Sequence, residues 1–191
     1  MVEGERRVNA VDRPSLTIVT PCLNSAPTLP TALESVRSQQ YGGQVEHLVV
    51  DGGSTDGTLE ILEAAPGVTY VSEPDRGLSD AVNKGIRMGQ GEIVGWLNAD
   101  DVYLPGAFEA VGRAFADAPD ALWATGPCLI MDESGNEIRK AVTAYKSFFL
   151  RHYSYSLQVE INSGERHVVS VMAPTKPGRR SVRSPSPSDA K

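Results

Sequence analysis

Short apolar runs alternate with longer segments in which an apolar residue recurs every three or four positions. The four runs are Leu16–Thr20, Val45–Val50, Val68–Val71 and Ile93–Leu97. Runs of this length that are rich in β-branched residues and end in glycine, proline or polar residues are typical of buried strands. The pattern therefore predicts four strands between residues 16 and 97.

The segments between these strands have helical periodicity. The spacing of Leu29, Leu33 and Val36 predicts a helix with Thr28 at its N-cap, and further helices are predicted over 59–65, 79–88 and 105–118. Asp56 or Ser54 is the expected cap of the second helix. Strands separated by helices of this length form right-handed βαβ units, so we expect an α/β fold with a mainly parallel sheet flanked by helices.

The pattern becomes weaker after residue 120. Trp123 and the run Cys128–Met131 predict further strand, and Glu133–Asn136 predicts a hairpin turn that leads to Ile138.

Composition narrows the classes of protein that fit. The chain has 191 residues, is 40% hydrophobic and 22% charged, and carries a net charge of −6. These values favour one soluble domain and argue against nucleic acid or an anionic membrane as the main partner. No apolar run is long enough to span a bilayer, and the first residues lack an apolar leader segment. We therefore expect a cytoplasmic protein, with association at a membrane surface left as an open alternative.

The charge is not evenly distributed. Residues 151–191 hold seven basic and three acidic residues, whereas residues 1–150 carry a net charge of −10. The last stretch is rich in proline, serine and arginine, which favours disorder. The expected organisation is a flexible segment over 1–14, a folded domain over 15–157 and a disordered basic tail over 158–191.

Ligands of parallel sheets bind beyond the carboxyl ends of the strands. The strand that ends at Leu97 continues into Asn98, Ala99, Asp100 and Asp101. Oxygen ligands on one turn suit Mg²⁺ or Mn²⁺, which can neutralise a diphosphate. The alternative is that Asp100 or Asp101 caps the helix that begins near Pro105.

Other candidate residues follow the first two strands. Asp51 ends the second strand, before Gly52 and Gly53, and its carboxylate can accept hydrogen bonds from a base or a ribose. We expect Cys22 to be a small packing residue and His47 to lie on the surface of a strand. The chain contains neither a GxGxxG nor a GxxxxGK[ST] motif, which removes the main support for a dinucleotide-binding or P-loop protein.

Six ordered segments carry a resemblance to a known family. They are Thr20–Asn24, Leu48–Thr58, Ser72–Gly77, Asp80–Gly85, Gly91–Ile93 and Leu97–Asp101. The series resembles the nucleotide-binding half of the family-2 glycosyltransferases, which have the Rossmann-type GT-A fold, and it covers roughly residues 15–140.

The resemblance implies an inverting transfer from a nucleotide-diphosphate sugar, with a UDP-sugar favoured, to a glycan or lipid-linked acceptor in cell-envelope or exopolysaccharide synthesis. It implies Mg²⁺ or Mn²⁺ as cofactor, with Asp100 as the metal ligand. The residues that it assigns to nucleotide-sugar binding are Pro21, Asn24, Asp51, Asp75, Arg76, Asp80 and Asn98.

The sequence departs from the family pattern in three places. Gly52 replaces the second residue of the usual Asp-Asp pair, and Asn98 replaces the first aspartate of the DXD motif. The third departure is that no acidic pair suited to a general base follows Gln158, and neither Glu160 nor Glu165 has a matching context. We therefore expect a C-terminally truncated family member in which a frame disruption or fusion begins near residue 159 and donor binding is retained more readily than transfer.

Two alternatives remain open at this stage. One is a receiver-like signalling module with Asp51 as phosphoacceptor, although Pro21–Asn24 holds no acidic pair where receivers need one. The other is an inactive truncated product that retains at most donor binding.

Overall fold

The computed structural model describes residues 13–118, 121, 123–125, 130–131, 137–138 and 167–170. Its elements in chain order are β1 (Leu16–Cys22), α1 (Leu29–Arg37), β2 (Val45–Asp51), α2 (Thr58–Ala64), β3 (Val68–Ser72), α3 (Leu78–Met88), β4 (Ile93–Trp96), α4 (Ala107–Asp117), β5 (Trp123–Thr125), β6 (Ile130–Met131), β7 (Glu137–Ile138) and β8 (His167–Ser170). The four predicted strand–helix units are confirmed.

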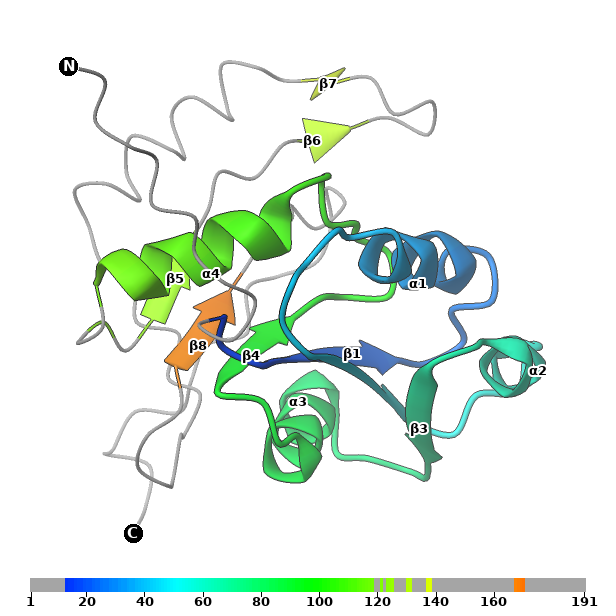
Figure 1. The fold of residues 1–191 in the computed structure, drawn as a ribbon. Helices are drawn as coiled ribbons and strands as arrows, with labels where there is room; N and C mark the ends of the chain where they lie inside the picture. Colours follow the sequence, from blue (N-terminus) through cyan, green and yellow to red (C-terminus); the bar gives the residue numbers. More distant parts are fainter. Residues whose placement is uncertain are drawn as a thin grey trace, which may run out of the picture.

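The main sheet has the strand order β3-β2-β1-β4-β8-β5, and its neighbouring strands run parallel (Figure 1). This confirms the predicted α/β fold with a parallel sheet. β8 is a strand that the sequence pattern did not predict, and it lies within the segment expected to be a tail. β6 and β7 pair antiparallel, with Ile130 opposite Ile138, as the predicted hairpin requires; its turn lies outside the described residues.

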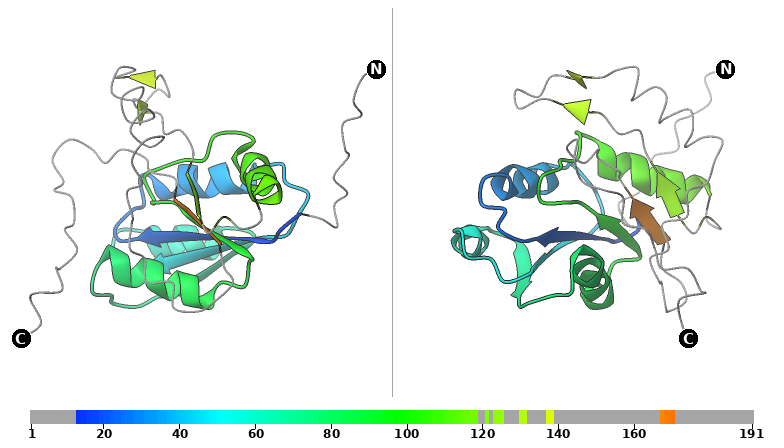
Figure 2. Two further views of the ribbon diagram at one scale, coloured as in Figure 1. Left: turned by 90° about the vertical axis from the view of Figure 1, so that its left-hand side faces the viewer. Right: turned by 180° about the vertical axis from the view of Figure 1, so that it is seen from behind.

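Helices cover both faces of the sheet. α1 and α4 lie on one face and α3 lies on the other (Figure 2). The apolar stripe of α1, formed by Leu29, Ala32, Leu33 and Val36, is buried against the sheet. Phe108 of α4 is also buried in this layer, so the helical periodicity of the sequence reports the faces that pack against the strands.

The approach of α3 to the sheet depends on a glycine. A Cβ on Gly85 would lie 3.0 Å or less from both γ-carbons of Val19 on β1. The helix can therefore rest directly on the strand only while residue 85 has no side chain. This close contact holds α3 against the sheet.

Two strand predictions need correction. Proline was expected to close the first strand, but β1 continues through Pro21, which pairs with Val50 of β2. β4 pairs with β1 only as far as Val19, so the missing N–H of Pro21 costs no ladder bond on that side. His47 was expected on a strand surface but is only 6% exposed, because helices cover both faces of a parallel sheet.

The predicted helix caps are confirmed only in part. Thr28 occupies the predicted N-cap position of α1, without a capping hydrogen bond from its side chain. The N-cap of α2 is Gly57 and not Asp56 or Ser54, and the N-cap of α4 is Gly106 and not Asp100 or Asp101; both glycines have positive φ.

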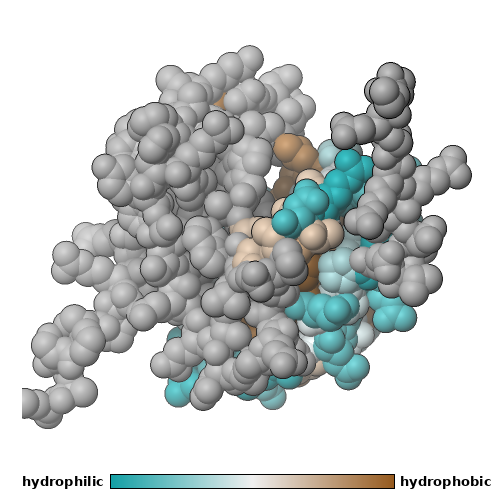
Figure 3. Space-filling model, turned by 60° about the vertical axis from the view of Figure 1, so that its left-hand side comes forward, coloured by the Kyte–Doolittle hydropathy of each residue, from teal (hydrophilic) through white to brown (hydrophobic). Residues whose placement is uncertain are grey.

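Within the described residues, no helix is long and apolar enough to cross a membrane. On the face shown in Figure 3, hydrophilic residues cover much of the described surface and a smaller hydrophobic area lies between them.

Candidate functional site

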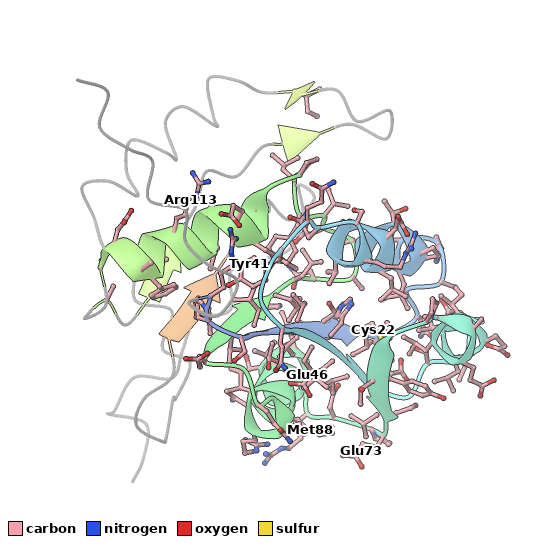
Figure 4. The ribbon with its side chains drawn as sticks, in the orientation of Figure 1. Cys22, Tyr41, Glu46, Glu73, Met88 and Arg113 are labelled. Atoms are coloured by element: carbon pink, nitrogen blue, oxygen red, sulfur yellow. The ribbon has the colours of Figure 1, made fainter. Side chains whose placement is uncertain are left out.

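The carboxyl ends of four parallel strands bring the candidate residues to one edge of the sheet. The register places Cys22 of β1 opposite Asp51 of β2, and Asp51 opposite Ser72 of β3. Figure 4 labels Cys22 and Glu73 where β1 and β3 end. The loops that follow β1, β2, β3 and β4 therefore form one rim, which we call the carboxyl edge.

Asp51 is the buried anchor of this edge. Its side chain is fully buried, and its Oδ2 accepts hydrogen bonds from the N–H groups of Gly53 (3.1 Å) and Ser54 (3.0 Å) and from the Ser72 hydroxyl (2.6 Å). Its Oδ1 accepts from the Ser54 hydroxyl and, at 3.6 Å, from the Cys22 thiol. A carboxylate offers about four lone-pair positions, so these donors use its acceptor capacity.

The environment of Asp51 keeps it ionised. Burial raises the pKa of the carboxyl group, but the hydrogen bonds from Ser54, Ser72 and Gly53 outweigh burial, and the pKa falls below its usual value. A fully buried carboxylate cannot reach a phosphodonor, which argues against the receiver-like alternative. Burial and the Asp51 charge raise the pKa of the Cys22 thiol to about 12. Cys22 is therefore a packing residue, as the sequence predicted, and not a nucleophile.

Asn24 joins the first two loops. Its side-chain oxygen accepts from the N–H of Thr55 (2.9 Å), and its own N–H donates to the Ser54 hydroxyl (2.7 Å). Asn24 has a φ of 51°, a left-handed conformation that asparagine tolerates better than most residues. Asp56 also connects these two loops, because its carboxylate accepts hydrogen bonds from the N–H groups of Ala26 and Thr58.

The β3–α3 loop holds the exposed charges. The guanidinium of Arg76 is 89% exposed and contacts the Asp80 carboxylate at 3.2 Å. The hydrogen bonds from the Arg76 side chain and N–H lower the pKa of Asp80. Lys84 pairs with Glu73 at 2.6 Å, which ties α3 to the end of β3. Arg76 thus presents a positive group to solvent at the carboxyl edge.

Gly52 provides space for Asp75. A Cβ on Gly52 would lie 2.8 Å from Asp75 Oδ2. The other oxygen, Oδ1, accepts from the N–H of Gly77 at 2.7 Å. The carboxylate of Asp75 therefore occupies the space into which a side chain at position 52 would project. A glycine, and not the second aspartate of the family pattern, therefore follows Asp51 where the Asp75 carboxylate needs the space.

The β4 end carries a chain of polar contacts. The indole N–H of Trp96 donates to Asn98 Oδ1 (3.0 Å), and Asn98 Nδ2 donates to Asp101 Oδ2 (2.8 Å). Burial raises the pKa of Asp101 to about 6; the Asn98 hydrogen bond opposes this rise, and the charge of Asp100 adds to it. Asp100 itself is exposed.

The donor set at this turn fits a metal that is held mainly by its substrate. The described residues contain no group of three or more His, Cys, Asp or Glu side chains that could hold a metal ion. Asp100 has no hydrogen bond or ion pair to another described residue, so its oxygens are available as hard ligands. A carboxylate with both oxygens free suits a Mg²⁺ or Mn²⁺ ion whose remaining ligands include phosphate oxygens and water.

Sequence reasoning missed the hydrogen-bonding roles of four residues at this edge. Ser54 and Ser72 hold Asp51, while Trp96 and Asp101 hold Asn98. Each lies within three residues of a predicted site residue, but side-chain direction is not readable from spacing alone. The general-base region after Gln158 lies outside the described residues apart from β8. A separate cavity of about 480 Å³, lined in part by Ser15 and Glu46, lies at the opposite edge of the sheet.

Comparison with known sequences gives a family match. The family model described as Glycosyl transferase family 2 matches residues 17–177. The match runs past residue 158, so the change of sequence that we expected near residue 159 is not reflected in it.

Two curated relatives are similar to part of the chain. An uncharacterized glycosyltransferase of Mycobacterium tuberculosis is 35% identical over 116 residues, which cover 60% of this chain and 42% of the relative. A PGL/p-HBAD biosynthesis glycosyltransferase of Mycobacterium bovis is 39% identical over 93 residues, which cover 46% and 36% of the two chains. The chain thus spans less than half of the length of these relatives.

Two solved structures share the fold. A mannosyltransferase of Pyrobaculum calidifontis in complex with GDP-Man and Mn²⁺ has a TM-score of 0.53 at 21% identity, over 87% of this chain and 59% of that one. S. aureus TarS 1–349 in complex with UDP-GlcNAc has a TM-score of 0.52 at 22% identity, over 65% and 36%. Identities this low establish a common fold and nothing further.

Proposed function

Because the chain belongs to glycosyltransferase family 2, we propose that its carboxyl edge binds a nucleotide-diphosphate sugar, with a UDP-sugar favoured. The whole protein then transfers the sugar, with inversion, to a glycan or lipid-linked acceptor in cell-envelope or exopolysaccharide synthesis. The sugar-transfer step belongs to the whole protein, because the chain spans less than half of its curated relatives.

The observation that carries this proposal is that one exposed positive side chain and one exposed negative side chain lie at the same edge of the sheet. Arg76 offers an exposed guanidinium after β3, and Asp100 offers an exposed carboxylate after β4. A guanidinium binds phosphate oxygens directly, and a carboxylate binds them through a divalent cation. A diphosphate between these two loops satisfies both groups.

The nucleoside half of the donor lies against the first two loops in this proposal. Pro21 and Asn24 shape the β1 loop, and Asn24 keeps it joined to the β2 loop. Asp51 supports the nucleoside site indirectly, because its oxygens already accept hydrogen bonds from protein donors. It contacts the base or the ribose only if one of these donors is exchanged for the ligand. Asp75 Oδ2 accepts no hydrogen bond from another described residue, so it is an available acceptor for the nucleoside.

Asp80 and Asp100 have separate tasks. Asp80 orients Arg76, to which it is bonded through both side chain and backbone N–H. Asp100 would hold Mg²⁺ or Mn²⁺, which supplies charge neutralisation to the diphosphate leaving group when bound. Asn98 belongs to the same turn, and its part is developed below.

Names of similar proteins support the donor class. The structures cited above were determined with UDP-GlcNAc and with GDP-Man and Mn²⁺. The M. bovis relative is named a PGL/p-HBAD biosynthesis glycosyltransferase, which supports a biosynthetic sugar transfer. We further propose that the protein works in the cytoplasm, on or near a membrane surface.

Isothermal titration calorimetry of the 191-residue chain with UDP and GDP, each with and without Mn²⁺, tests the proposal. We expect saturable binding of at least one diphosphate, with UMP much weaker. Arg76→Ala should weaken the binding about tenfold, the low end for a hydrogen bond to a charged group. Arg87→Ala is the matched control, because it removes an exposed arginine from the last turn of α3. If the folded protein binds neither diphosphate, the proposed function is wrong.

A further inference from the structure

We propose that Trp96 and Asn98 are positioning residues that hold the Asp101 carboxylate beside Asp100. The turn after β4 then offers two carboxylates to the metal–diphosphate, although its first polar position is an amide. This inference rests on the proposed function, and it assigns Asn98 a different role from the ligand contact that the family resemblance implies.

The first argument is that both ends of the Asn98 amide are already bonded. Its oxygen accepts from the Trp96 indole N–H at 3.0 Å, and its nitrogen donates to Asp101 Oδ2 at 2.8 Å. An indole N–H is only a donor, so it fixes which end of the amide faces Trp96. The nitrogen must then face Asp101. A direct bond from the Asn98 oxygen to a ligand would compete with Trp96.

The second argument is that the chain of contacts starts from a rigid element. Trp96 is the last residue of β4, and the N–H of Leu97 still donates to the Val19 carbonyl of β1 at 3.0 Å. The N–H of Asp101 donates to the Asn98 carbonyl at 3.1 Å, which closes the turn. The hydrogen bonds from Trp96 to Asn98 and from Asn98 to Asp101 therefore hold the Asp101 side chain in a fixed position relative to the sheet.

The third argument concerns what remains free. Among the described residues, only Asn98 donates a hydrogen bond to the Asp101 carboxylate, and it uses Oδ2. Oδ1 is therefore available, next in sequence to the exposed Asp100. A carboxylate with one oxygen held and one free is the arrangement in which a supporting residue orients a metal ligand.

The amide at position 98 is required by this arrangement. An aspartate there would be unable to donate to Asp101 and would place two carboxylates in contact. If residue 98 were itself a metal ligand, an aspartate would bind a divalent cation better than an asparagine. The two roles therefore predict opposite effects for a single substitution.

The experiment compares UDP binding, with and without Mn²⁺, in wild type, Asn98→Asp, Asn98→Ala and Trp96→Phe by calorimetry. Loss of a supporting residue typically costs 10–100-fold in metal affinity, so we expect the Mn²⁺-dependent gain in UDP affinity to fall by about tenfold in both Asn98 variants. Trp96→Phe keeps an aromatic ring but removes the indole N–H, and it should cause a smaller loss. Gln40→Glu, the same amide-to-carboxylate change at an exposed site, is the control.

A second readout uses Mn²⁺ alone, without nucleotide. In ¹H–¹⁵N spectra, Mn²⁺ should broaden the Trp96 indole resonance, and Asn98→Ala should require a higher Mn²⁺ concentration for the same broadening. Tighter or unchanged Mn²⁺-dependent binding in Asn98→Asp overturns the positioning role while the proposed function stands. Absence of any diphosphate binding in the folded wild type overturns both.

Discussion

Asn24 provides a quantitative test of how the carboxyl edge is held together. Asn24→Ala removes the acceptor for the Thr55 N–H, which costs about 0.5–1.5 kcal/mol, since that N–H can be hydrated. It also replaces asparagine by a residue that tolerates a φ of 51° less well, which adds up to about 1 kcal/mol. The expected loss of unfolding free energy is therefore about 1–2 kcal/mol. Asn24→Gly avoids the backbone strain and should lose about 1 kcal/mol less.

Urea denaturation at pH 7, followed by far-UV circular dichroism, measures these differences. Asn24→Asp keeps the acceptor and is the matched control, with an expected change of about 0.5 kcal/mol or less. The reasoning is refuted if Asn24→Ala unfolds within about 0.5 kcal/mol of wild type, or if Asn24→Gly is the less stable of the two variants.

Three further predictions concern packing, the nucleoside pocket and pH. Gly85→Ala should lower the unfolding free energy by at least about 1 kcal/mol in the same assay, because overpacking against Val19 exceeds the gain in helix propensity, whereas Arg87→Ala should change it by about 0.5 kcal/mol or less. Gly52→Ala should displace the Asp75 carboxylate and weaken UDP binding in calorimetry with little loss of stability; unchanged affinity would argue against that carboxylate as a nucleoside contact. Burial lowers the pKa of His47 to about 4, so the unfolded chain takes up the proton first and stability falls as pH drops below about 6.5. The stability gap between wild type and His47→Gln should therefore narrow by about 2 kcal/mol from pH 7.5 to pH 5, and a constant gap in urea titrations would contradict the assignment.

The fold could be predicted well because its signals are local. The first four strands and helices each carry a local apolar run or stripe, and the structure places all of them within a few residues of the predicted bounds, although the edge strand β3 is largely exposed. The errors arise where a residue's partner is distant in sequence. His47 is buried because helices cover both faces of the sheet, and β8 joins the sheet between β4 and β5, far from either in the chain.

The candidate site could be predicted only in part. The strand order brings the predicted loops to one edge, but the hydrogen-bond partners of each side chain depend on the tertiary structure. Asp51 was expected to face a ligand, and its oxygens instead accept five protein donors. Asn98 shows a related limit. Its partners Trp96 and Asp101 lie within three residues of it, but the motif does not encode the direction in which its amide points.

The most direct test of the donor site is calorimetric titration of wild type and Asp100→Ala with UDP in the presence and absence of Mn²⁺. Asp117→Ala, which removes an exposed aspartate at the end of α4, is the control. If Asp100 holds the metal that bridges to the diphosphate, Mn²⁺ should strengthen UDP binding to wild type and to the control, and this gain should disappear in Asp100→Ala. An equal Mn²⁺-dependent gain in all three proteins would contradict the site.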